Sequence, residues 1–154
     1  MSHLNKEDSP GWHRNFAVKT NNRAWDLLTK NRTLEEDREM LNAAHASAYH
    51  WSVCGTKFHH MRATMLLSEV HSLLGYGASA YKYAQEMKEF FFSKETPDWE
   101  IAFTHTIHAH ASHVNGNMKQ YAISFAAADR AIKDIEDEED RAIVLQTFNL
   151  IPKS

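Results

Sequence analysis

The feature that most constrains the fold of this chain is an internal repeat between residues 62 and 132. The segments RATMLLSEVHSLLGYGASAYKYAQEM and FTHTIHAHASHVNGNMKQYAISFAAADRAI each read as two helices joined by a turn that contains glycine. The turn glycines, Gly75 and Gly116, are 41 residues apart. A helical pair of this size cannot bury its apolar face alone, so repeated pairs stack on one another. The repeat therefore predicts an all-α array of helical pairs.

The composition agrees with such an array. The chain has 154 residues, which suits one domain over residues 1–154. Only 5 residues are Gly and 3 are Pro, which favours long helices with short connections over a turn-rich β fold. Hydrophobic residues make up 43% and charged residues 24%, a balance typical of a globular protein.

Two patterns near the N-terminus predict helix starts. Ser9 followed by Pro10 suits an N-cap and the first helical position, where the missing N–H of proline costs nothing. Thr33 with Glu36 matches a capping box, in which each side chain accepts a hydrogen bond from the backbone N–H of the other. The first helix is therefore expected to end near residue 30, and the second to begin at residue 34.

Further signals divide the rest of the chain. Gly55 is expected to end the second helix in the left-handed conformation, and Thr96 with Pro97 to begin a later helix as N-cap and first residue. The predicted organisation is a disordered segment (1–9), three helical pairs (10–54, 57–93 and 97–135) and a last helix (138–151) that begins in the acidic run 136–140.

Three consecutive aromatic residues, Phe90, Phe91 and Phe92, end the second pair. Successive residues of a helix point in different directions, so all three cannot face one core. At least one is expected to be exposed or to lie in a self-association surface. A homodimer is therefore a possible assembly.

The repeat resembles the tetratricopeptide repeat family. The matching positions are Leu67, Ser68 and Ala80 in the first copy, with His71 where Tyr is usual, and Ala109, Phe125 and Ala128 in the second. The second copy departs from the family at His105, His108, Ser112 and Tyr121, and its period exceeds the family's 34 residues, an excess that we place in the connector FFSKETPD. The resemblance implies a right-handed, tetratricopeptide-like array of about seven antiparallel helices with a C-terminal capping helix. The segments AAHASAYHW and EDRAIVLQTFNLIP also resemble a group of uncharacterised bacterial proteins of similar length, from which no activity can be carried over.

The resemblance also implies a binding surface, because the first helix of each tetratricopeptide pair lines a concave face. The equivalent positions here are Arg62, Met65, Glu69 and Ser72 of the first copy and Phe103, Thr106, His110 and His113 of the second. We expect this face to be exposed, since an unpaired buried Arg62 or Glu69 would destabilise the fold strongly. The alternative, in which the first or last helix covers these residues and makes them core, stays open.

Eleven histidines are the one unusual feature of the composition. The zinc motif H-E-x-x-H and the paired E-x-x-H motif of di-iron bundles are absent. Most of the histidines are expected to fill aromatic positions of the repeat, as His71 and His105 do. If the repeat instead holds a metal, Glu69, His110 and His113 are its candidate ligands.

Several functions are disfavoured by what the sequence lacks. A net charge of −3 without a basic cluster argues against nucleic acid. The sequence shows no signal peptide and no apolar stretch of membrane-spanning length, and its single cysteine, Cys54, suits a reducing compartment, so we expect a cytoplasmic protein that does not bind membranes. It contains no phosphate-binding loop, no G-x-S-x-G and no C-x-x-C motif, so no cofactor is expected and an enzyme is unsupported.

The sequence thus favours a non-catalytic helical-repeat module that binds a protein or peptide. Two alternatives remain open. One is a histidine-lined protein that binds a metal or small molecule and has catalytic activity. The other is a structural subunit that mainly associates with itself.

Overall fold

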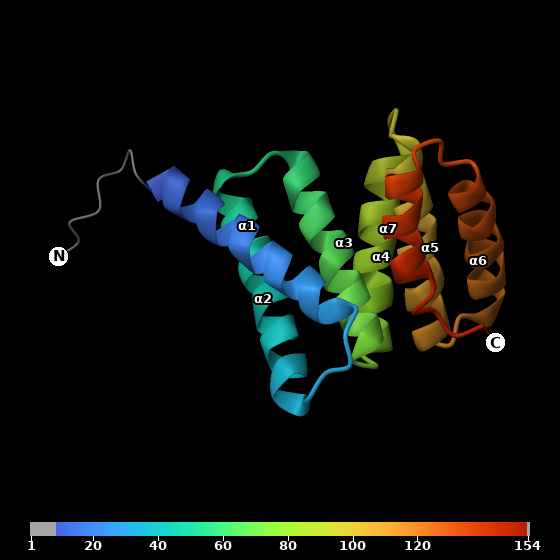
Figure 1. Ribbon diagram of the computed structural model, residues 1–154, viewed down its shortest axis with the longest axis horizontal. Helices are drawn as coiled ribbons and strands as arrows, with labels where there is room; N and C mark the ends of the chain where they lie inside the picture. The colour runs from blue at the N-terminus through green and yellow to red at the C-terminus, as the bar shows by residue number, and fades with distance from the viewer. Residues whose placement is uncertain (1–8, 154) are drawn as a thin grey trace. The chain divides into compact units, whose positions relative to one another are not determined.

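The structure is a computed structural model that describes residues 9–153, with side chains from Gly11 onward. Within this range the chain forms seven α-helices and no strand (Figure 1). The helices are α1 (Ser9–Leu28), α2 (Leu34–Cys54), α3 (Lys57–Leu73), α4 (Gly77–Phe92), α5 (Asp98–Val114), α6 (Met118–Lys133) and α7 (Glu138–Phe148). The predicted all-α fold with about seven helices is confirmed. The predicted disorder before residue 9 and the predicted side-chain cap at Ser9 fall outside the described residues and side chains.

The start of α2 is held by the predicted capping box. The Glu36 N–H donates to Thr33 Oγ1 at 3.2 Å, and the Thr33 N–H donates to Glu36 Oε1 at 3.1 Å. Arg32 connects this start to the preceding helix, because its Nη1 donates to the last carbonyls of α1 while its Nε donates to Asp37 at 2.6 Å. The short connection between α1 and α2 is therefore tied down at both of its ends.

The 41-residue repeat is reproduced helix by helix. The first helices of the two pairs, α3 and α5, both have 17 residues, and the second helices, α4 and α6, both have 16. Each helix of the second pair begins and ends 41 positions after its counterpart in the first pair. For example, α3 begins at residue 57 and α5 at residue 98, and α4 ends at residue 92 and α6 at residue 133. In helix length and spacing, the segment α3–α4 is therefore repeated in α5–α6.

The turns of the two hairpins have the same geometry. Gly75 has φ 82° and Gly116 has φ 80°, a left-handed conformation that glycine adopts without strain. In both turns the glycine N–H donates to the carbonyl three residues earlier, and the next N–H donates to the carbonyl five residues earlier. This Schellman pattern satisfies the last carbonyls of α3 and α5 and starts the next helix two residues after the glycine.

Gly55 ends α2, but not in the predicted left-handed conformation. Its φ of −92° and ψ of 173° are extended. Glycine is needed here for space, since a Cβ would lie 2.7 Å from the His59 Cβ and 2.8 Å from the Trp51 carbonyl oxygen. This closeness lets the His59 ring stack on Trp51 at 4.2 Å between centroids.

The predicted start of α5 is wrong by one residue. Pro97 is the N-cap and Asp98 the first helical residue, and no side chain caps the end. Thr96 instead donates its hydroxyl to the Phe91 carbonyl at 2.6 Å, which satisfies one of the free carbonyls at the C-terminus of α4. At α7 the acidic run does act as a cap, because Asp137 accepts a hydrogen bond from the Asp140 N–H at 2.9 Å.

The helices form two compact units, residues 1–67 and 68–154, and the division falls within α3. In the first unit α1 packs against α2, and in the second α5 packs against α4, α6 and α7. The buried apolar side chains of the first unit include Ala17, Leu27, Leu28, Met40 and Trp51, and those of the second include Val70, Met87, Phe91, Ile107 and Ile132. One domain over residues 1–154 stays a prediction.

The aromatic run is divided between core and surface, as predicted. Phe91 is fully buried, whereas Phe92 is 38% exposed and contacts the His105 ring at 4.7 Å. Phe90 is partly buried, with the Lys94 Nζ 3.9 Å from its ring centroid. Self-association through this run stays a prediction.

Candidate functional site

The expected exposed face of the repeat is largely buried. Of its eight residues, Met65, Glu69, Ser72, Phe103, Thr106 and His110 are buried, His113 is partly buried and Arg62 is exposed. The expectation that Glu69 would be exposed is therefore wrong. That expectation assumed that a buried Glu69 would have no charge partner and would therefore destabilise the fold. In the structure Glu69 has such a partner, so its burial does not carry that cost. Whether any of the eight residues contacts a partner stays a prediction.

The partner of Glu69 is His110, and both side chains lie in the second unit. The His110 Nδ1 is 3.0 Å from Glu69 Oε1 and 2.9 Å from Oε2. Glu69 is 0% exposed and His110 3% exposed. Burial lowers the pKa of His110, but the charge of Glu69 and its hydrogen bonds outweigh burial and raise that pKa above its ordinary value. The pair thus favours a protonated His110.

His108, two residues before His110, is held in the opposite protonation state. Its Nδ1 is 2.7 Å from Ser124 Oγ, and its Nε2 contacts the Oε1 of Gln85. Because a carbonyl oxygen only accepts, Nε2 donates to Gln85, and Nδ1 is free to accept from Ser124, which itself accepts from Gln120 at 2.9 Å. Burial, with a smaller effect of nearby Lys88, lowers the pKa of His108 to about 4. His108 is therefore a neutral core histidine.

The candidate metal ligands of the repeat do not assemble as a set of three. Glu69 and His110 are together, while His113 lies edge-on against Tyr121 at 4.9 Å between ring centroids. Among the described residues no group of three or more His, Cys, Asp or Glu side chains could hold a metal ion. His71 and His105 have the predicted role of aromatic fillers, because His71 packs against Tyr76 and Tyr83 and His105 against Phe92.

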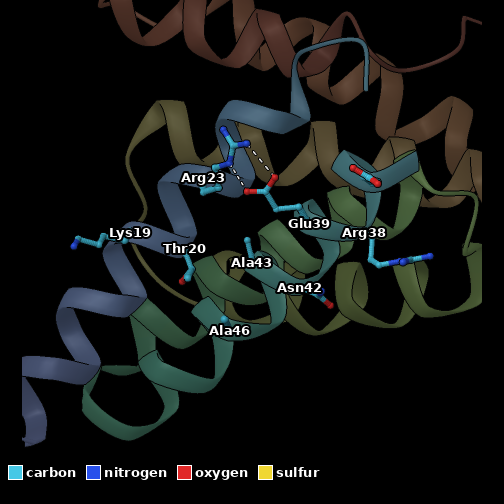
Figure 2. A pocket seen from close by; sticks show the side chains of 9 residues that line it. Lys19, Thr20, Arg23, Arg38, Glu39, Asn42, Ala43 and Ala46 are labelled. Carbon is cyan, nitrogen blue, oxygen red and sulfur yellow. Dashed lines mark hydrogen bonds and ion pairs between the residues drawn. The ribbon is translucent and has the colours of Figure 1, made fainter. Parts of the chain in front are cut away.

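A groove that the sequence reasoning missed lies along α1 and α2 in the first unit (Figure 2). Its volume is about 610 Å³. It is lined by Lys19, Thr20 and Arg23 of α1 and by Glu35, Arg38, Glu39, Asn42, Ala43 and Ala46 of α2. Thr20, Ala43 and Ala46 have small side chains, while the longer side chains form a charged rim.

An ion pair spans this groove. Arg23 donates from Nε to Glu39 Oε2 at 2.6 Å and from Nη2 to Oε1 at 3.0 Å, a two-point contact that fixes both side chains (Figure 2). The hydrogen bonds raise the pKa of Arg23 and lower that of Glu39, so both groups are charged at neutral pH. Lys19 and Arg38 extend on opposite sides of this pair, so the rim offers two further cations.

The sequence contains one signal of this groove, which is the spacing of the residues that line it. Lys19 with Arg23, Glu35 with Glu39 and Arg38 with Asn42 are each four residues apart, which places each pair on one face of its helix. Such faces are ordinarily solvated, however, and the sequence alone does not show that α1 and α2 present theirs to the same side.

A second, smaller cavity of about 210 Å³ lies between α5 and α7, lined by Trp99, Phe103, Asp140, Ile143 and Val144. It includes Phe103 from the predicted binding face. Its walls are mostly apolar, with the Asp140 carboxylate as the only charged group in the lining.

Comparison of the chain with known protein families, with curated proteins and with solved structures found no significant match. In the part of the chain that the structure describes, none of the helices combines the length and apolar character needed to cross a membrane.

Proposed function

We propose that this chain is a non-catalytic, tetratricopeptide-like helical-repeat module that binds a protein or peptide segment in the groove of α1 and α2. The observation that carries the proposal is the groove itself, about 610 Å³ in volume with a rim of charged side chains on two packed helices. The two equal hairpins that follow support the repeat character, since tandem helical pairs of one length are how solenoid proteins are built. In this proposal the helices form a right-handed antiparallel array and α7 is its capping helix.

The chemistry of the groove favours a partner segment that carries carboxylates. Arg23 and Glu39 neutralise one another, which leaves Lys19 and Arg38 against the single remaining carboxylate of Glu35. A guanidinium such as that of Arg38 can bind a carboxylate at two points, and the small side chains of Ala43 and Ala46 leave room for a backbone to approach. The candidate face of α3 and α5 is mostly buried, so the groove of α1 and α2 is the more accessible of the two surfaces.

The test is a peptide-display selection against the untagged chain, followed by affinity measurements on the selected peptides. We expect acidic peptides to be enriched, and the double variant Lys19→Glu with Arg38→Glu to weaken their binding at least tenfold. Lys82→Glu with Lys119→Glu is the matched control, because it makes the same charge change at exposed positions of the second unit. Equal binding by the two double variants, or enrichment without acidic residues, would contradict the proposal.

A further inference from the structure

The first unit contains a pair of histidines whose ring nitrogens face each other. His13 of α1 and His50 of α2 place their Nδ1 atoms 2.8 Å apart, and both rings are partly buried. The pair is held by aromatic neighbours: the Phe16 ring lies 5.5 Å from His50, and the Tyr49 ring lies 5.3 Å from His50 and 6.1 Å from His13. One of the two rings donates a hydrogen bond to the other, so the two nitrogens point toward each other.

This arrangement is close to that of two ligands of one zinc ion. Zinc bound by histidine has Zn–N distances of about 2.0–2.1 Å and tetrahedral geometry, which separates two ligand nitrogens by about 3.3 Å. The observed 2.8 Å separation reaches this value with a small rotation of either ring.

One copy of the chain supplies only half of such a site. Structural zinc sites have four protein ligands, and in the described residues no third His, Cys, Asp or Glu joins this pair. A second copy related by a two-fold axis through the metal would bring an identical pair, because a two-fold contact places the same residues opposite one another. Four imidazoles would then surround the ion.

The surface around the pair suits a contact with a second copy. Four large apolar residues on the same helix ends, Trp12, Phe16, Tyr49 and Val53, expose between 46% and 61% of their surface. Each lies one or three residues from a histidine of the pair in its own helix. Exposed apolar side chains gathered in this way usually mark a contact surface, and a two-fold contact would bury them around the metal.

We propose that His13 and His50 form one half of a four-histidine zinc site, which two copies of this chain complete across a two-fold axis. The proposal does not depend on the binding groove, because none of the residues that line the groove belongs to the pair or to its apolar rim. The metal would hold two first units together and would take no part in chemistry, since a site closed by four protein ligands has no open position for a substrate.

The test is native mass measurement of the untagged full-length chain with Zn²⁺ alone as the probe, before and after a chelator. We expect a dimer that carries one zinc ion per two chains. His13→Gln and His50→Gln should each abolish zinc uptake and zinc-dependent dimerisation, while circular dichroism shows unchanged helix content. The matched controls His45→Gln and His3→Gln remove histidines outside the pair and should leave both properties as they are.

A second variant examines the surface without touching the ligands. Val53→Lys places a cation on the exposed rim, so we expect it to weaken the zinc-dependent dimer at least tenfold. A monomer with one zinc ion per chain, zinc uptake that survives in both His13→Gln and His50→Gln, or no zinc uptake at all would each overturn the proposal. A zinc-dependent dimer that Val53→Lys does not weaken would also overturn it.

Discussion

Glu69 and His110 occupy the same position in two successive hairpins, 41 residues apart, and their buried side chains are hydrogen bonded to each other. The carboxylate of Glu69 in α3 thus neutralises the imidazolium of His110, which lies at the equivalent position of α5. Because the two groups are 0% and 3% exposed, neither can exchange its partner for water. The pair therefore specifies how α5 sits against the end of α3.

Removing one member of this pair should be costly. Glu69→Gln and His110→Gln should each destabilise the second unit by about 3–5 kcal/mol, because each leaves the other group buried without its charge partner. The double variant should cost clearly less than the sum of the two single variants. Chemical denaturation of all four proteins measures this coupling, and additive costs would show that the two groups do not interact.

The stabilisation from His110 should depend on pH. Its pKa in the folded chain lies above the ordinary value of 6.5, so the native state holds a proton that the unfolded state releases. The contribution is therefore complete below pH 6.5 and is lost as the pH rises through the folded pKa. The difference in unfolding free energy between the wild type and His110→Gln should shrink as the pH rises above 6.5. His45→Gln, on the exposed surface of α2, should show no such change.

His108 should have the opposite pH dependence. Its pKa of about 4 in the folded chain lies below that of an unfolded histidine, so the unfolded state binds more protons between pH 6.5 and pH 4. Stability should therefore fall by about 3 kcal/mol as the pH drops through this range, on account of this one group. In NMR titrations the ring signals of His108 should stay constant from pH 8 to pH 5, whereas those of an exposed histidine move. A midpoint near 6.5 for His108 would contradict the buried hydrogen-bond network.

Alanine substitutions at the glycines in and beside the turns should distinguish the destabilisation caused by a left-handed backbone from that caused by a steric clash. Gly75→Ala and Gly116→Ala should each destabilise the fold by about 1–2 kcal/mol, because their φ values are 82° and 80° while a Cβ at either position meets nothing within 4 Å. Asn at the same positions should cost less, since it adopts the left-handed conformation more readily. Gly77→Ala should act by collision instead, because its Cβ would lie 2.6 Å from the Val114 carbonyl oxygen. Thermal unfolding of these variants checks the ranking.

The capping box at α2 predicts a smaller effect. Thr33→Ala removes the hydroxyl that accepts from Glu36 and should cost about 1 kcal/mol without changing helix content. Thr33→Ser keeps the acceptor and should retain most of the stability. An unchanged unfolding midpoint for Thr33→Ala would mean that the cap does not hold the helix start.

Replacing Phe91 and Phe92 singly with serine should have two different outcomes. Phe91→Ser should destabilise the second unit by about 3 kcal/mol or more, because it empties a fully buried position. Phe92→Ser should leave stability nearly unchanged, and any role of the run in self-association should appear as a change in native mass. If both variants merely unfold, the assignment of Phe92 to the surface is wrong.

Most helix bounds could be read from the sequence because the signals that set them are local. A capping box acts over four residues, and a left-handed glycine acts within one turn, so α2, α4 and α5 end or begin within a residue of their predicted positions. Gly55 shows where local reading fails. A glycine is required at position 55 because His59 of α3 lies close to Trp51 of α2. This contact can be recognised only when the positions of both helices are known.

The site residues were less accessible to prediction for the same reason. The burial of Glu69 depends on His110 in another hairpin, and the groove depends on two solvated faces turned to one side. Neither relationship leaves a signature within a window of a few residues. The pairing of Glu69 and His110 could have been suspected, since the repeat period itself places an acid and a base at equivalent positions.

The equal hairpins also bear on how such a chain can change in length. Because every helix bound recurs after 41 positions, a duplication of residues 57–97 in the gene would add a third hairpin with its turn and connector already in place. A duplication whose ends fell inside a helix would instead change which residues of that helix face its neighbour. The period is therefore the natural increment by which this protein can gain or lose sequence and still fold.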